Sequence, residues 1–275
     1  MSKRLYLETT ILRSRLIGHS SIRHFLAEKL KNQTRITSEF VRMEFNRSFI
    51  CNLIEFYFNL QNQNSIDDAI RWWNENYQTR KIKDINFIVD KLFIGIDDRQ
   101  DIKRALANLR NEIKKIITLF NCLIHRLEKN NTRCYFTEVK LDFESCVTVE
   151  ELESTLVKFY KAYRDNYVDK CNIIAFFNES KETLRRIIEY ESKESGFLNQ
   201  KDKLNEIVHS GKKLTCKVCC NVGDTIIALE CPDYAILLST DKAFEDLCKI
   251  MGLKYEIIDS LRAIHPSKEI LKKLN

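Results

Sequence analysis

The spacing of hydrophobic and polar positions changes twice along the chain, and the two changes divide it into three parts. Residues 4–8 (RLYLE) form a short apolar run typical of a strand, and helical spacing follows from Thr9 to Gly18. The pattern then predicts a helix over 21–30, a brief strand over 35–37 and a long helix after Ser38, whose hydroxyl suits an N-cap. The chain therefore begins as strands alternating with helices.

The middle part, from about residue 61 to residue 210, reads as one helix after another. The clearest is 101–127, whose apolar residues follow the 3.6-residue period closely. Capping-box-like signatures begin at Ser65 and Thr148, and a further helix is predicted around 182–194. This part predicts a helical bundle, and an exposed apolar face on the helix over 102–127 would suit a homodimer.

After Gly211 the alternation returns, with a helix over 224–230, a strand over 235–239, a helix over 242–251 ended by Gly252, and a strand over 254–258. Strands separated by short helices predict a parallel sheet, and therefore the α/β class. If both ends of the chain share this sheet, residues 1–60 and 211–275 form one discontinuous domain. Residues 61–210 are then an all-helical insertion into it.

Composition supports this assignment and adds a charge asymmetry. The chain has 275 residues, of which 6 are Gly and 2 are Pro, too few for a turn-dense all-β protein. The formal charge is +6, and residues 1–60 carry ten Lys and Arg against five Asp and Glu. A polyanion should meet this first part, although solvated helix faces that bind nothing explain the same charges.

The location that the sequence predicts is the cytosol, with no membrane partner. No apolar run reaches the roughly 18 residues needed to cross a bilayer, and the start MSKRLYLETT has no signal-peptide core. Ten cysteines in a chain of this length are therefore expected as reduced thiols, without a structural disulfide.

Carboxylates occupy the positions where a parallel sheet binds ligands. Glu8 and Asp241 lie at the carboxyl ends of predicted strands, Asp224 opens a helix, and Glu44 lies about two turns into another. Ligands of open α/β sheets bind outside the carboxyl ends of the strands. Four carboxylates converging there would repel one another unless cations balanced them, and oxygen ligands suit Mg²⁺ or Mn²⁺.

Four segments then resemble, in order, the PIN-domain family of metal-dependent nucleases: YLETTIL, ITSEFVRMEF, CKVCCNVGDTIIALECPD and LLSTDKAF. The resemblance covers about the first 60 and the last 65 residues and leaves out the helical block. It implies a PIN-like three-layer α/β/α domain in which the family's four acids fall on Glu8, Glu44, Asp224 and Asp241. Its supporting hydroxyls fall on Thr10 and Thr240.

The activity that this resemblance implies is two-metal hydrolysis of phosphodiesters by an endonuclease, with RNA as the first substrate and DNA left open. The family usually has Asp where this chain has Glu8, and the extra methylene moves the carboxylate by roughly 1.5 Å. A preference for Mn²⁺ or weak activity is therefore expected. The rival hypotheses are a toxin-type ribonuclease held by a protein inhibitor and a catalytically inert PIN-like module that binds RNA or protein.

Simpler structural roles are open for the acids taken singly. Asp224 and Asp241 could each cap a helix, and Glu44 could pair with Arg47 on the helix surface. Glu8 closes an apolar strand and has no comparable alternative. The order of all four along the chain favours the metal site.

Two other motifs have weaker functional interpretations. Cys216, Cys219 and Cys220 invite a zinc site, but a second ligand pair is missing, so small buried thiols are favoured. The Arg71-Trp72-Trp73 group mixes charge with stacking surface, although two tryptophans packed in the bundle explain it better. Candidate nucleic-acid contacts are the cations Arg13, Arg15, Arg42, Arg80, Lys81 and Lys83.

Overall fold

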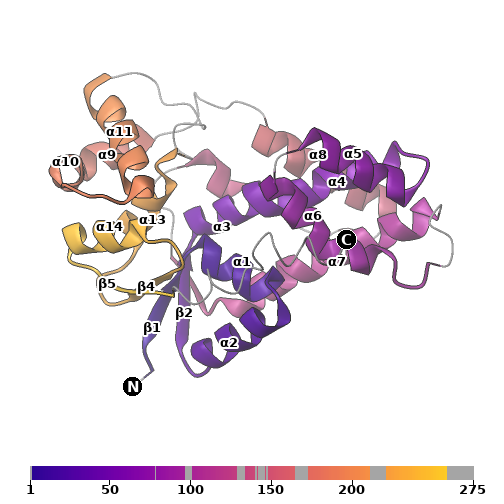
Figure 1. Ribbon diagram of the computed structural model, residues 1–275, viewed down its shortest axis with the longest axis horizontal. Helices are drawn as coiled ribbons and strands as arrows, with labels where there is room; N and C mark the ends of the chain where they lie inside the picture. Colours follow the sequence, from indigo (N-terminus) through magenta and orange to yellow (C-terminus); the bar gives the residue numbers. More distant parts are fainter. Residues whose placement is uncertain are drawn as a thin grey trace. The chain divides into compact units, whose positions relative to one another are not determined.

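The computed structural model describes residues 2–77, 79–96, 101–128, 134–139, 141, 146, 148–164, 173–210 and 221–258. Its chain forms two compact units. The first comprises Met1–Arg42, Ile124–Thr137 and Asn166–Asn275, and the second comprises Met43–Leu123 and Glu138–Asp165. Figure 1 labels most of the helices and strands of both.

The first unit is built on a five-stranded sheet in which all the pairings are parallel. This confirms the predicted α/β class. The strand order is β3-β2-β1-β4-β5, so the first strand of the chain lies at the centre of the sheet. The strands are β1 (Arg4–Leu7), β2 (Thr34–Ser38), β3 (Arg126–Glu128), β4 (Ile236–Ser239) and β5 (Lys254–Ile257).

Helices on both faces make this unit a three-layer α/β/α structure (Figure 1). The chain moves one way across the sheet from β1 to β2 and the other way from β4 to β5, so right-handed crossovers place their helices on opposite faces. Leu5, Tyr6 and Leu7 of β1 are all buried, as expected for a central strand covered on both sides. The helices of this unit are α1 (Thr9–Ile17), α2 (Ser20–Leu30), α9 (Ile173–Glu179), α10 (Lys181–Glu189), α11 (Ser195–Ser210), α13 (Gly223–Glu230) and α14 (Ala243–Met251), with the 3₁₀ turn η2 (Tyr135–Glu138) at its boundary.

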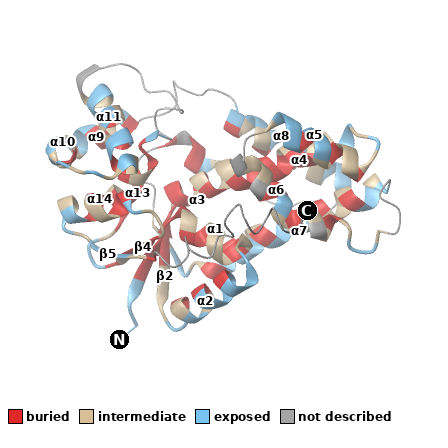
Figure 2. Cartoon of the chain, viewed as in Figure 1, coloured by how far each residue is buried: buried red, intermediate tan, exposed pale blue. Residues whose placement is uncertain are grey.

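The described elements of the second unit are all helical, and their buried faces are red in Figure 2. Aromatic side chains make up much of this core. Trp73 packs edge-on against Phe56 with ring centroids 5.3 Å apart. Both predicted capping signatures are confirmed, because Ser65 accepts from the N–H of Asp68 and Thr148 from the N–H of Glu151. The elements are η1 (Asn46–Ile50), α4 (Cys51–Gln61), α5 (Ile66–Asn76), α6 (Thr79–Leu92), α7 (Ile102–Leu123) and α8 (Val149–Arg164), while α3 (Glu39–Phe45) spans the boundary between the units.

The structure differs from the predicted elements in three places. The helix predicted over 101–127 ends at Leu123, and Leu127 lies in β3 instead. The helix predicted after Ser38 is three consecutive segments with a π-helical turn at Asn46–Ile50. The helix predicted around 182–194 ends at Glu189, because the backbone of Tyr190 is extended.

The unit boundaries also differ from the predicted 60/61 and 210/211. Residues 61–210 contain the edge strand β3, and α9, α10 and α11 group with the sheet rather than with the helical unit. Contacts of α14 with α10 and α11 account for this grouping. Within the described part of the chain, no helix is long and apolar enough to cross a membrane.

Candidate functional site

The carboxyl ends of β1 and β4 lie side by side, because the register pairs Leu7 with Leu238. From these two neighbouring strands the chain proceeds in opposite directions, towards β2 and towards β5. Such a topological switch point is where open α/β sheets bind their ligands. A functional group that directly follows either strand therefore lies at this edge of the sheet.

Glu8 is the first residue after β1 and is only 2% exposed. Its carboxylate caps α1, since Oε2 accepts from the N–H of Thr10 at 2.7 Å. The other oxygen, Oε1, accepts from the hydroxyl of Ser239 at 3.0 Å and from the hydroxyl of Thr10. Hydrogen bonds from one N–H and two hydroxyls fix the orientation of this carboxylate.

The hydroxyl of Thr10 joins the two strand ends. It lies 2.7 Å from the hydroxyl of Thr240 and accepts from the N–H of Thr240 at 3.4 Å. The Ser239 hydroxyl in turn accepts from the N–H of Asp241 at 2.9 Å. Four predicted site residues thus meet in one hydrogen-bonded cluster, and Ser239 is a member that the sequence analysis missed.

Asp241 has a local structural role close to the cap that was left open, although the N-cap residue of α14 is Lys242. Its Oδ1 accepts from the N–H of Ala243 at 3.0 Å, at the start of α14. A carboxylate has two oxygens with about four acceptor sites, so this hydrogen bond and cation binding are compatible roles for the side chain.

Asp224 lies in the first turn of α13, where the helix dipole favours a negative charge. Its Oδ2 accepts from Nε2 of Gln200 in α11 at 2.7 Å. Gln200 is 6% exposed, and its Oε1 accepts from both the N–H and the hydroxyl of Thr225, at 3.0 and 3.1 Å. This amide fixes the first turn of α13, yet it lies inside the predicted insertion and was not among the predicted site residues.

The remaining predicted acid, Glu44, is a half-buried residue of α3 and belongs to the second unit. Among the described residues, no group of three or more His, Cys, Asp or Glu side chains is arranged to hold a metal ion. The donors at the sheet edge are carboxylate and hydroxyl oxygens, which in kind suit Mg²⁺ and Mn²⁺. At this edge the Ser239 hydroxyl links the carboxylate of Glu8 to the backbone N–H of Asp241.

The predicted nucleic-acid cations have varied environments. Arg42 donates to the carbonyl of Thr137 at 3.2 Å, and Arg13 is half-buried. The pKa of Arg15 is lowered, first by burial and then by Arg23 and Arg35. The remaining three lie in the second unit, where Lys81 is engaged in an ion pair and the side chains of Arg80 and Lys83 lie outside the described residues.

The weaker motifs are resolved in part. Trp73 is buried, which confirms its packing role, whereas Trp72 is 38% exposed. Cys216, Cys219 and Cys220 lie outside the described residues. The nearby Cys231 and Cys248 are buried free thiols, and burial raises the pKa of Cys248 to about 12.

A scan against models of protein families found no match for this chain, and neither did searches of curated proteins and of solved structures. The fold and the edge residues define an α/β protein with an acidic, hydroxyl-rich switch point. The PIN-family resemblance stays a prediction from the four sequence segments.

Proposed function

We propose that this chain is a metal-dependent endonuclease that hydrolyses phosphodiester bonds, with single-stranded or structured RNA as its substrate. The observation that carries the proposal is the position of Glu8 and Asp241 at adjoining strand ends of the switch point, joined through Ser239 and Thr10. Acidic oxygen donors at such an edge are what phosphodiester hydrolysis with Mg²⁺ or Mn²⁺ requires.

The side chains have distinct roles in this proposal. Glu8, Asp224 and Asp241, all in the first unit, would hold the ion or ions. The resemblance implies Glu44 as a fourth acid. When bound, a divalent ion lowers the pKa of a coordinated water and stabilises charge on the leaving oxygen.

The uncharged neighbours of these acids orient them. The Thr10 and Ser239 hydroxyls fix the carboxylate of Glu8, and the amide of Gln200 fixes that of Asp224. Partners of metal ligands commonly contribute about 10–100-fold to metal affinity or activity. These positioning contacts are therefore testable parts of the proposed site.

The direct experiment is cleavage of labelled single-stranded RNA and DNA by the purified chain with Mn²⁺, Mg²⁺ or EDTA. Cleavage should require the metal and be lost in Asp224→Asn and in Asp241→Asn. Asp202→Asn, an exposed position on α11, is the matched control and should cut like the wild type. Metal-independent cutting, or cutting unchanged in both site variants, would contradict the proposal.

A second candidate is an inert module that binds RNA without cutting it. The observation that favours it is the hydrogen bond that the Asp241 carboxylate accepts from the N–H of Ala243, which gives this acid a role in the fold itself. RNA binding that persists in EDTA without any cleavage in Mn²⁺ would support this candidate over the nuclease.

A further inference from the structure

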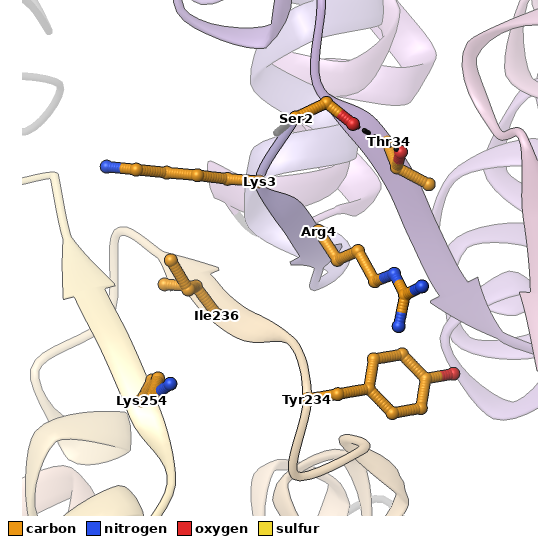
Figure 3. Close-up of a pocket in the computed structure, with 7 residues that line it drawn as sticks. All are labelled: Ser2, Lys3, Arg4, Thr34, Tyr234, Ile236 and Lys254. Carbon is orange, nitrogen blue, oxygen red and sulfur yellow. Dashed lines mark hydrogen bonds between the residues drawn. The ribbon is translucent and has the colours of Figure 1, made fainter.

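The opposite edge of the sheet, at the amino ends of the strands, has a hollow of about 600 Å³ (Figure 3). Its walls come from the first residues of β1, β2, β4 and β5 and from the turn before β4, all in the first unit. A four-residue strand such as β1 spans roughly 13 Å, so this hollow is separate from the acidic edge.

Three cations line this hollow: Lys3, Arg4 and Lys254. All three are exposed. The ion pairs of the described residues include none of the three, although many other lysines and arginines in this part of the chain have a carboxylate partner. Their charges are therefore not neutralised by described carboxylates and are available to an anion from solution.

Arg4 is positioned by an aromatic ring rather than by an acid. Its guanidinium carbon lies 4.9 Å from the ring centroid of Tyr234, and Figure 3 shows the two side chains facing each other. The Tyr234 hydroxyl donates to Glu128 at 2.8 Å, which fixes the ring. A guanidinium held through its face keeps its in-plane N–H donors for a planar or tetrahedral oxyanion such as phosphate.

Hydroxyls and further cations extend the surface beside these residues. The hydroxyls of Ser2 and Thr34 lie 3.1 Å apart on the wall of the hollow. A neighbouring hollow of about 560 Å³ shares these two residues and adds Arg35 and Lys31. Lys31 also pairs with Glu28 at 3.5 Å, but this pair is exposed and therefore weak. Positive charge continues along the edge, which favours an extended anion with repeated charges over a single small one.

We propose that this surface, called here the basic rim (Lys3, Arg4, Lys31, Arg35 and Lys254), binds the sugar–phosphate backbone of single-stranded RNA. It is a second contact for the strand, apart from the acidic edge. The choice of RNA rests on the proposed function, whereas the choice of a polyanion rests on the rim itself. Phosphate contacts of this kind position a strand without reading its sequence.

The test is fluorescence anisotropy of a labelled RNA bound to the full chain in EDTA, which separates binding from cleavage. An RNA of about 20 nucleotides exceeds the roughly 4–16 that comparable grooves cover. Lys3→Ala/Lys254→Ala should weaken RNA binding by about tenfold or more. The plot of the logarithm of the binding constant against the logarithm of the salt concentration should become shallower by about 1.4, because each lost phosphate contact to a single strand removes about 0.7 from its slope.

Two matched variants locate the effect. Lys103→Ala/Lys114→Ala removes two exposed cations of α7 and should bind RNA like the wild type. Lys3→Arg/Lys254→Arg preserves both charges and should also retain binding. Undiminished binding by the Lys3→Ala/Lys254→Ala variant, or an equal loss in the α7 control, would overturn the proposal.

A parallel titration with phosphatidylserine vesicles distinguishes a membrane surface from RNA. If the rim variant loses vesicle binding but keeps RNA binding, the proposal is wrong. A wild-type chain that binds RNA through the rim but never cuts it would contradict the nuclease and leave the rim intact.

Discussion

Two glutamates of low exposure, one in each unit, are held in different ways. In the helical unit, Glu55 accepts from Tyr77 at 2.6 Å and from Lys81 at 2.8 Å and forms an ion pair with Arg164. Burial raises the pKa of Glu55, but these hydrogen bonds and the charge of Arg164 outweigh it, so the pKa lies below its ordinary value. The charge of this carboxylate is balanced inside its own unit.

In the sheet unit, the carboxylate of Glu8 accepts from the N–H and the hydroxyl of Thr10 and from the hydroxyl of Ser239. These hydrogen bonds join Glu8 to the start of α1 and to the neighbouring end of β4. The comparison separates a glutamate held by cations inside the helical unit from one held in a hydroxyl-rich cluster at the carboxyl ends of β1 and β4, where we propose the metal site. Substitution of Glu8 should therefore mainly lower cleavage, whereas substitution of Glu55 should mainly lower the free energy of unfolding.

The largest expected effect is on cleavage by Glu8→Gln. The amide keeps the size of the side chain but removes the charge, so cleavage of RNA in Mn²⁺ should fall by at least about 100-fold, because even partners of metal ligands are worth about 10–100-fold. Initial rates under matched conditions measure the loss, and thermal unfolding checks that the fold persists. Activity within a few-fold of the wild type would remove Glu8 from the site.

Gln200→Ala should have the next largest effect, because it frees Asp224 and Thr225 from the amide that holds them. We expect cleavage to fall by about 10–100-fold. Asn199→Ala, at the exposed neighbouring position of α11, is the control and should cut normally. If both variants behave alike, Gln200 is a packing residue and not a positioning residue.

Glu55→Gln should instead lower the free energy of unfolding, by about 2 kcal/mol at neutral pH. Removing one partner of a buried ion pair costs about 3–5 kcal/mol, and the partial exposure of Arg164 reduces this. Guanidinium unfolding followed by circular dichroism measures the difference, with Glu75→Gln on the exposed side of α5 as the control.

The difference in stability between the wild type and Glu55→Gln should depend on pH. Because the folded-state pKa of Glu55 lies below its ordinary value of 4.5, its contribution is fully present above that pH and is lost as the pH falls through the folded-state pKa. The difference in the free energy of unfolding between the wild type and Glu55→Gln should therefore disappear at acidic pH. A difference that is constant with pH would show that the charge of the carboxylate is not what stabilises this unit.

Ser65→Ala should have the smallest effect, about 1 kcal/mol on unfolding, because it removes the N-cap of α5. It should leave cleavage unchanged, whereas Ser239→Ala should lower cleavage by loosening Glu8. Each of these two variants removes one oxygen atom, one from the helical unit and one from the cluster around Glu8. Loss of cleavage in Ser65→Ala at unchanged stability would contradict the distinction between the two units.

Much of the sheet unit could be predicted from sequence because its signals are local. Apolar runs end at Glu8 and near Asp241, and parallel strands bring their carboxyl ends to one edge. Gly252 ended its helix as predicted, with a φ of 71° that favours glycine.

The contacts that complete the site depend on packing between distant segments. Gln200 reaches Asp224 only because α11 packs on the sheet unit, and no periodicity in residues 195–210 indicates this. The edge strand β3 was missed because Leu127 continues the helical spacing of α7, and three residues are too few to give a strand pattern of their own. The basic rim combines residues from both ends of the chain, so a count of charges along the sequence could not locate it.

The most direct test of the central claim is calorimetric titration of Mn²⁺ into the full chain after treatment with EDTA. Our account predicts saturable binding in the wild type and in Asp202→Asn, and affinity lowered by about 100-fold or more in Glu8→Gln/Asp241→Asn. Absence of saturable binding in the wild type, or equal affinity in the double variant, would contradict a metal site at the carboxyl ends of β1 and β4.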